Sequence, residues 1–289
     1  KELDFQKDFY VTIISRLIRI AVLIISAYYL RSVWAFVVAY LSLNFTSAVL
    51  SYFFHPYRPR LDFNFKIFKS LFSFGGWVFA SQFIKSLYDI VDRSAIGRLM
   101  TATSLGYYHI AYRFGNEVPN ELKSVFNQVL FPLYAIQQDD LEKSKRNFFL
   151  ILKLTSYLIF PLITSVFFLS EHLIILFFGD QWFSAVGPLK ILLFIALIQS
   201  LVSSSFPLFK GLGFPRYETY LLSISVGTIF VFIYPLTKKY GIEGAALTVL
   251  IGQLVALPFS IIFLRKLLPF KLHELLTSLI KPFLISLLI

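Results

Sequence analysis

Residues 85–98 read KSLYDIVDRSAIGR, a segment with five charged side chains inside one of the longest apolar stretches of the chain. Lys85, Asp89 and Asp92 fall within about 60° of one another when a helix turns by about 100° per residue. Arg93 borders the same stripe. The pairs Lys85–Asp89 and Asp89–Arg93 both have the i,i+4 spacing at which opposite charges interact along a helix. The pattern predicts a helix that directs one charged stripe away from apolar surroundings.

The composition of the whole chain indicates a membrane protein. Of its 289 residues, 57% are hydrophobic, 15% are charged and 34 are phenylalanines. A soluble domain has about 25% charged residues, which cover its surface. The shortfall predicts that much of the surface of this chain contacts lipid rather than water.

Charge and cysteine content exclude several functions. The chain has no cysteine, which removes disulfides, thiol catalysis and cysteine-based metal sites. Its net charge of +11 is spread between apolar segments rather than concentrated in one patch. This distribution indicates membrane topology, and we expect no nucleic-acid partner.

Nine apolar segments are long enough, at about 20 residues, to cross roughly 30 Å of hydrocarbon. They are residues 9–30, 33–54, 71–97, 103–134, 147–169, 185–210, 217–237, 242–264 and 272–289. We therefore predict an all-α, polytopic membrane protein. The chain begins without methionine or a signal peptide and stops inside an apolar segment, so we expect an internal fragment.

Lysine and arginine are distributed unequally between alternate loops. Fourteen lie at the amino end and in the loops at 55–69, 137–146, 210–216 and 265–271, and four lie in the opposite set. Because positive residues accumulate on the cytoplasmic side, the first set is predicted to face the cytoplasm. The 55–69 loop is basic and contains two prolines, which makes it a candidate boundary between two lobes.

Polar residues recur within other predicted helices. The first carries Arg16 and Arg19, which are three residues apart and share a face. Segment 103–134 has a longer polar face, made of Arg113, Asn116, Glu117, Asn120, Ser124 and Asn127. Pro119 is expected to bend this helix. Glu121 and Lys123 fall off the main stripe.

Two explanations account for polar residues at membrane depth. They can pair between helices, or extend toward lipid headgroups, and so serve only the structure. Alternatively, neighbouring helices turn their polar faces toward a water-filled cavity. The second explanation is favoured for Asp92, Arg113 and Glu117, since a charge near the bilayer centre costs at least roughly 2–3 kcal/mol. A cavity with cations in excess suits a bulky anionic ligand, such as a diphosphate that carries sugars.

No catalytic or metal-binding pattern accompanies these residues. The sequence has no HExxH motif, no GxSxG motif and no glycine-rich phosphate loop. Its four histidines, His55, His109, His172 and His273, lie on separate segments. We therefore expect no catalytic residue, no metal site and no cofactor.

Several short motifs resemble those of a known family. DRSAIGRLMTATSLGYYHIAYRF (92–114) resembles the D-x-x-x-IGR-L…LG-x-Y-x-x-AYR stretch of Wzx-type bacterial polysaccharide flippases, which belong to the MOP exporter superfamily. FFGDQWFSAVGPLKIL (177–192), KGLGFPR (210–216), YGIEGAALT (240–248) and LDFQK (3–7) resemble further motifs of that family. The motifs occur in the family's order and cover nearly the full chain.

The resemblance implies that the nine segments are helices five to thirteen of a fold with about twelve to fourteen helices. In that fold, two helical lobes surround a central cavity that opens alternately to each side of the membrane. Residues 1–54 would end the amino-terminal lobe, 55–70 would form a cytoplasmic linker, and 71–289 would form most of the carboxy-terminal lobe.

A substrate is implied as well: an undecaprenyl-diphosphate-linked oligosaccharide repeat unit. It would be flipped across the bacterial inner membrane for O-antigen or exopolysaccharide synthesis. The implied protein is a transporter and not an enzyme. Membrane lipids, a coupling H⁺ or Na⁺ ion and the polysaccharide polymerase machinery are the further expected partners.

In this interpretation the polar residues have different roles. Positive potential for the diphosphate would come from Arg16, Arg19, Lys85, Arg93 and Arg113. Asp89, Asp92 and Glu117 would balance those charges, bind sugar hydroxyls or take the coupling ion. Asn116 and Asn120 would line the same cavity.

Other functions remain open from the sequence. A MATE-like multidrug or cation antiporter of the same superfamily would favour an acidic cavity without cationic residues. A membrane-embedded glycosyltransferase or ligase of polysaccharide assembly would require a long extramembrane loop. A structural membrane subunit would not require the polar face of 103–134.

Overall fold

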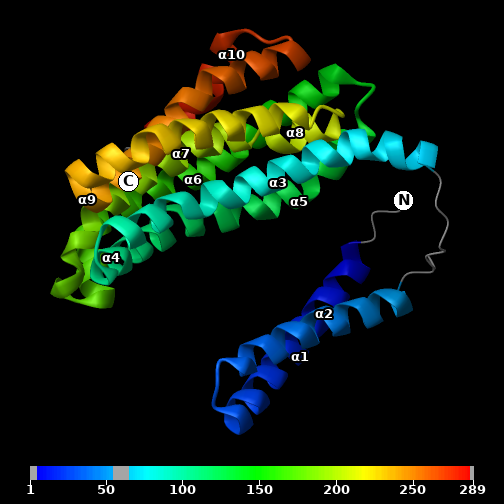
Figure 1. Ribbon diagram of the computed structural model, residues 1–289. Helices are drawn as coiled ribbons and strands as arrows, with labels where there is room; N and C mark the ends of the chain where they lie inside the picture. Colours follow the sequence, from blue (N-terminus) through cyan, green and yellow to red (C-terminus); the bar gives the residue numbers. More distant parts are fainter. Residues whose placement is uncertain (1–4, 55–64, 287–289) are drawn as a thin grey trace. The chain divides into compact units, whose positions relative to one another are not determined.

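The computed structural model describes residues 5–54 and 65–286, which form helices joined by short turns (Figure 1). The helices are α1 (Phe5–Leu30), α2 (Trp34–Phe54), α3 (Phe65–Leu99), α4 (Ala102–Tyr112), η1 (Arg113–Glu117), α5 (Val118–Ile136), α6 (Leu141–Phe178), η2 (Asp180–Ala185), α7 (Val186–Ser203), α8 (Phe206–Gly211), α9 (Arg216–Leu267) and α10 (Leu272–Ser286). The prediction of an all-α fold is confirmed for the described residues.

The nine predicted segments correspond to the observed helices. α1, α2, α3, α6 and α10 account for one each, as do the composite stretches α4–η1–α5 and η2–α7–α8. α9 accounts for two, because its 52 residues are broken at Gly241, where φ is 63° and ψ is −139°. The predicted count of nine is therefore confirmed within the described ranges.

Five helical stretches of the described chain are long and apolar enough to cross a membrane. They are Phe9–Leu30, Trp34–Phe54, Leu141–Phe178, Asp180–Gly211 and Arg216–Leu267. Together with the composition, they indicate a multi-pass membrane protein. α3 carries the charged stripe of residues 85–98, which lowers its apolar character relative to these five.

The structure consists of two compact units, divided between Phe65 and Lys66. The first unit is a hairpin of α1 and α2 (Figure 1). Ala35 and Ala39 are each 1% exposed in it, and such small side chains let helices in lipid approach closely. The Ser26 hydroxyl donates to the backbone carbonyl of Ala35 across the hairpin (3.3 Å).

The linker predicted at 55–70 falls largely outside the described residues, which do not include 55–64. Residues 65–70 begin α3. This helix therefore starts before the predicted segment 71–97.

The second unit is a bundle of long helices (Figure 1). α3, α4, α6, α7 and α9 each contribute to one apolar core. Ile96, Tyr108, Ile159, Ile195 and Ile229, one from each of these helices, are fully buried. A second apolar cluster joins α5, α6, α8, α9 and α10. The bundle is therefore held by two buried clusters along its length.

The break in α9 makes two antiparallel crossings. A Cβ on Gly244 would overlap the backbone carbonyl of Leu236, so this position admits only glycine. The Ser225 hydroxyl donates to the carbonyl of Gly252 between the two halves (3.4 Å). The YGIEGAALT motif thus forms the tight turn between two membrane crossings.

A π-turn interrupts the helix between Ala102 and Ile136. In η1 the backbone N–H of Val118 donates to the carbonyl of Arg113, five residues earlier. Pro119 follows at the start of α5 and has no N–H to donate. The predicted disturbance at Pro119 therefore takes the form of a π-turn just before it, a feature that often marks functional sites.

Two motifs from distant parts of the sequence meet in the bundle. The Trp182 ring, from GDQW, lies 3.7 Å from the position that a Cβ of Gly106 would occupy. It also makes an edge-to-face contact with Tyr107, with ring centroids 5.4 Å apart. The tryptophan ring of GDQW therefore packs against the helix that carries LG-x-Y.

Candidate functional site

The charged stripe on α3 begins with an ion pair. Lys85 Nζ lies 2.9 Å from Asp89 Oδ2, and the two side chains are 51% and 38% exposed. The pairing predicted from their spacing is confirmed. The expected ion pair between the Asp89 carboxylate and Arg93 is wrong. The Arg93 guanidinium donates instead to the backbone carbonyl of Asp89.

Asp92 lies inside the bundle, with 2% of its surface exposed. Its Oδ2 accepts a hydrogen bond from the Tyr108 hydroxyl on α4 (2.7 Å), and its Oδ1 accepts from the backbone N–H of Arg93 (2.7 Å). These donors offset the free-energy cost of burying a polar group. Asp92 therefore connects α3 to α4.

Arg93 lies beside this carboxylate. Its Nε is 4.0 Å from Asp92 Oδ1, and its guanidinium carbon is 4.4 Å from the centroid of the Tyr112 ring. A guanidinium over an aromatic face is held by electrostatic attraction. Arg93 Nε is buried and has no hydrogen-bond partner among the described residues.

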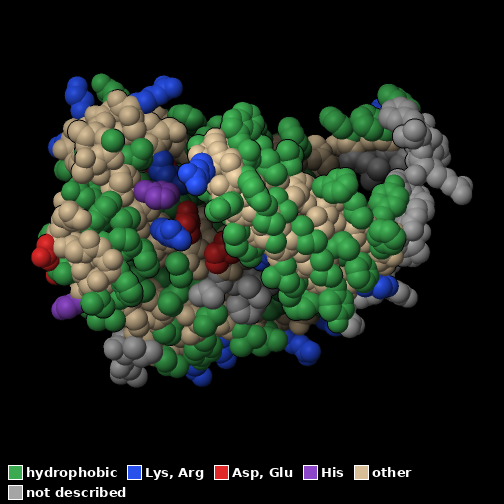
Figure 2. Space-filling view, turned by 90° about the horizontal axis from the view of Figure 1, so that it is seen from below, with side chains coloured by type: hydrophobic (Ala, Val, Ile, Leu, Met, Phe, Trp, Pro, Cys, Tyr) green, Lys and Arg blue, Asp and Glu red, His purple; other side chains and the backbone are tan. Residues whose placement is uncertain are grey.

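The π-turn separates the polar residues of the next helix. Arg113 and Glu117 are exposed, whereas Asn116 is 3% exposed. The side-chain oxygen Oδ1 of Asn116 accepts a hydrogen bond from Asn120 Nδ2 (2.9 Å). Arg113 has no ion-pair partner among the described residues. In Figure 2, basic, acidic and histidine side chains lie next to one another among hydrophobic ones.

A cavity of about 290 Å³ lies between α3, α5, α7, α8 and α9, and we call it the inner cavity. Its polar lining comprises Lys85, Tyr88, Asp89, Asn120, Glu121, Lys123, Ser124, Gln199, Ser203, Ser225 and Gln253. Three of the predicted site residues, Lys85, Asp89 and Asn120, belong to it. Asp92, Arg93, Arg113, Asn116 and Glu117 do not line it.

Sequence reasoning missed most of the polar residues of this cavity, among them Lys123, Gln199 and Gln253. Lys123 was placed off the polar stripe, although it is 5% exposed and lines the cavity. Lys123 lies three residues after Asn120 on α5, beyond the π-turn, so both side chains reach the same broad face of that helix. Gln199 and Gln253 could have been noticed as isolated amides in apolar helices.

Arg16 and Arg19 belong to the first unit. Both are exposed on α1, as expected for residues on one helical face. The structure describes them within that unit only. Any role next to the residues of the second unit stays a prediction.

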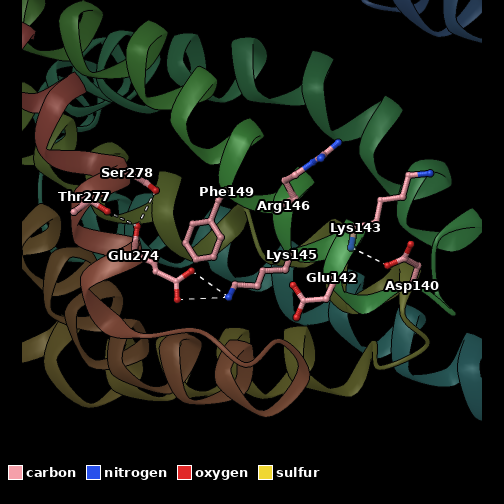
Figure 3. Close-up of a pocket in the computed structure, with 9 residues that line it drawn as sticks. All are labelled: Asp140, Glu142, Lys143, Lys145, Arg146, Phe149, Glu274, Thr277 and Ser278. Atoms are coloured by element: carbon pink, nitrogen blue, oxygen red, sulfur yellow. Dashed lines mark hydrogen bonds and ion pairs between the residues drawn. The ribbon is translucent and has the colours of Figure 1, made fainter.

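A larger pocket of about 750 Å³ lies between the start of α6 and α10 (Figure 3). Lys145 Nζ lies 3.1 Å from Glu274 Oε2, and Arg146 and Lys143 point away from that pair. The Asp140 side chain accepts a hydrogen bond from the backbone N–H of Lys143 (2.9 Å) and so caps α6. None of the predicted site residues lines this pocket.

The described part of the chain contains no group of three or more histidine, aspartate or glutamate side chains placed to hold a metal ion. The chemistry that the polar residues offer is therefore hydrogen bonding and charge.

Comparison with known proteins assigns the family. Residues 1–187 match the family described as polysaccharide biosynthesis protein, which is well over half of the chain. The chain belongs to the polysaccharide biosynthesis protein family. The Wzx-type resemblance seen in the motifs is thereby confirmed.

Curated relatives of this polysaccharide biosynthesis protein carry related names. It is 28% identical over 202 residues to the lipopolysaccharide biosynthesis protein WzxC of Escherichia coli, which covers 69% of this chain and 41% of the relative. It is 24% identical over 205 residues to the teichuronic acid biosynthesis protein TuaB of Bacillus subtilis, with 70% and 42% covered. The chain thus spans less than half the length of these relatives.

A solved structure shows the same fold. The lipid II flippase MurJ, in an inward closed conformation, superposes with a TM-score of 0.66 at 15% sequence identity. The alignment covers 95% of this chain and 59% of MurJ. The MOP-type helical fold implied by the motifs is confirmed.

Proposed function

We propose that this chain is part of a transporter that flips undecaprenyl-diphosphate-linked oligosaccharide repeat units across the bacterial inner membrane, for synthesis of O-antigen or exopolysaccharide. Transport would proceed by alternating access. Among the relatives, one from Shigella flexneri is named a putative O-antigen transporter, and one from Rhizobium meliloti a succinoglycan biosynthesis transport protein. These names describe transport rather than catalysis.

One structural observation carries the proposal. Polar side chains gather on α3, η1 and α5, in a bundle whose helices otherwise present apolar surfaces. Such residues are expensive in a membrane unless they serve a substrate or ion path. Cations are part of this group, which favours an anionic substrate and disfavours the multidrug or cation antiporter.

The geometry suggests how the proposed roles divide. Arg113 is exposed and has no ion-pair partner among the described residues, so its guanidinium is available for the diphosphate. Lys85 is already paired with Asp89 and contributes less positive potential. We assign the diphosphate chiefly to Arg113, supported by Arg93, and a contribution of Arg16 and Arg19 stays a prediction from the sequence.

Coupling ions would act on carboxylates. Glu117 is exposed on η1, beside Arg113 in the proposed substrate path. Asp92 is enclosed by Tyr108 and Arg93 and is less accessible. We therefore propose Glu117, with Asp89, as the group that would take a proton or sodium ion.

The test uses the full-length protein in the bacterium that encodes it. Deletion of the gene should abolish surface polysaccharide and leave lipid-linked repeat units on the cytoplasmic side. Complementation with the native gene should restore the polysaccharide, whereas Arg113→Ala should fail at an unchanged protein level in the membrane. Arg98→Ala, a change on the exposed end of α3, serves as the matched control and should complement.

Other outcomes would point to the alternatives. Drug sensitivity with normal polysaccharide in the deletion strain would contradict the proposal and support an antiporter. Repeat units that accumulate on the periplasmic side would indicate a later assembly step and would also contradict it. Full complementation by Arg113→Ala would remove this residue from the substrate path.

A further inference from the structure

Three buried polar atoms of the inner cavity have no hydrogen-bond partner among the described residues. They are Lys123 Nζ on α5, Gln199 Oε1 on α7 and Gln253 Oε1 on α9. Lys123 is 5% and Gln253 is 4% exposed. Buried polar atoms in folded proteins nearly always have a partner. The cavity therefore has hydrogen-bonding capacity that a ligand or water must use.

Contacts within the protein determine which polar atoms of the inner cavity can bind a ligand. Gln253 Nε2 donates to the Tyr88 hydroxyl (2.7 Å), which holds this side chain and leaves its carbonyl oxygen without a donor. Lys85, also on the cavity wall, is paired with Asp89. Within the described part of the chain, Lys123 Nζ is therefore the buried donor of the cavity without a partner, and the two amide oxygens are its buried acceptors without one.

The combination of donor and acceptors distinguishes between ligand groups. A diphosphate offers only acceptor oxygens, so it could bind Lys123 but would face the carbonyl oxygens of Gln199 and Gln253 without a hydrogen bond. Asp89 and Glu121, on the same wall, would also repel it. A metal cation would be repelled by Lys123. Hydroxyl groups donate and accept, and they match both amides in either orientation.

The size of the cavity limits the ligand further. About 290 Å³ equals the share of roughly ten water molecules in the liquid, at the lower end of the roughly 300–1,000 Å³ of small-molecule sites. This space holds one ring-sized polar group rather than a chain of sugars.

We infer that the inner cavity binds one sugar residue of the transported lipid through its hydroxyl groups. Lys123 donates to the sugar, and Gln199 and Gln253 accept from it. The diphosphate binds outside this cavity. The inference rests on the proposed function. It adds a site that binds the sugar and is separate from the site of the lipid diphosphate.

The experiment compares two lipids that differ by one sugar. Full-length protein in lipid nanodiscs is titrated with undecaprenyl diphosphate and with undecaprenyl-diphosphate-linked glucose. The variants are Lys123→Met and the double substitution Gln199→Leu with Gln253→Leu, which keep side-chain size and remove the hydrogen bonds. Lys153→Met on α6 and Gln82→Leu on α3 are matched controls, because neither residue lines the cavity.

We expect the native protein and both controls to bind the glucose-linked lipid at least about tenfold more tightly than undecaprenyl diphosphate. Both variants should lose this ratio and keep their affinity for undecaprenyl diphosphate. Equal affinity of the native protein for the two lipids would overturn the inference. So would variants that keep the ratio, since water alone would then fill the cavity.

A variant that lowers the affinity for both lipids equally would also overturn the inference, because the cavity would then bind the diphosphate or stabilise the fold. The two variants are independent, so misfolding of one leaves the other as the test. A native protein that binds neither lipid would contradict the proposed function itself. This result differs from equal binding of the two lipids, which would contradict only the inference.

Discussion

Asp92 keeps a carboxylate inside the bundle because each of its oxygens has a hydrogen-bond donor. The Tyr108 hydroxyl and the backbone N–H of Arg93 supply them, both at 2.7 Å. Tyr108 is itself fully buried. The two side chains are therefore mutually dependent, since removal of either leaves the other unsatisfied in a place that water does not enter.

This dependence can be measured in a double-mutant cycle. Asp92→Ala and Tyr108→Phe should each lower the free energy of unfolding by about 1–3 kcal/mol, because each leaves a buried polar group without its partner. The double variant should be less destabilised than the sum, with a coupling of about 0.5–3 kcal/mol. Equilibrium unfolding of the full-length protein in micelles provides the values, with Tyr107→Phe as control. Strict additivity would contradict a direct Asp92–Tyr108 bond.

Residue spacing foretold some of these contacts and not others. Lys85 and Asp89 are four residues apart on one helix, so their pairing follows from helical geometry alone. Tyr108 is sixteen residues from Asp92 and on another helix, so only the packing of α3 against α4 brings them together. No pattern within either helix encodes that distance.

At the scale of elements, the π-turn η1 sets the contact between the polar helix and α7. Gly115 lies in this turn and is buried. A Cβ at this position would be 2.7 Å from Leu192 Cβ, closer than two non-bonded carbon atoms approach each other. The absence of a side chain therefore lets η1 pack directly against α7.

Gly115→Ala should destabilise the protein by about 1–3 kcal/mol, because η1 and α7 must move apart to accept the extra methyl group. Gly227→Ala is the matched control. A Cβ there would meet nothing within 4 Å, and alanine should stabilise α9 by about 0.5–1 kcal/mol. The unfolding midpoints of the two variants, each compared with that of the native protein, measure these changes in stability. Equal effects of the two substitutions would show that η1 does not pack closely on α7.

The π-turn also marks the limit of pattern reading along one helix. A uniform helical wheel placed Asn120 on the polar face, and the structure places it on the wall of the inner cavity. The same wheel placed Arg113 and Glu117 on that face, although neither of them lines this wall. Hydropathy determines that a helix forms here, but the π-turn that changes its register depends on Pro119 and on packing at Gly115.

At the scale of the whole molecule, the fold follows largely from hydropathy. Nine apolar segments predicted nine crossings, and even the two crossings merged in α9 were separated correctly, because Gly241 and Gly244 mark the turn. The meeting of Trp182 with Gly106 could not be predicted, since it depends on how distant helices pack. Motif order suggested the family, and the structure adds which motifs pack against each other.

The orientation of this bundle in the membrane can be tested with single cysteines, because the 289 residues contain none of their own. Loops rich in lysine and arginine stay in the cytoplasm, so Asp139→Cys should react with an impermeant maleimide only after the membrane is opened. Lys239→Cys, at the opposite end of a crossing, should react in intact spheroplasts. Both positions are exposed and should label equally in detergent, which is the control. The reverse pattern would contradict the predicted orientation and would place the pocket between α6 and α10 on the periplasmic side.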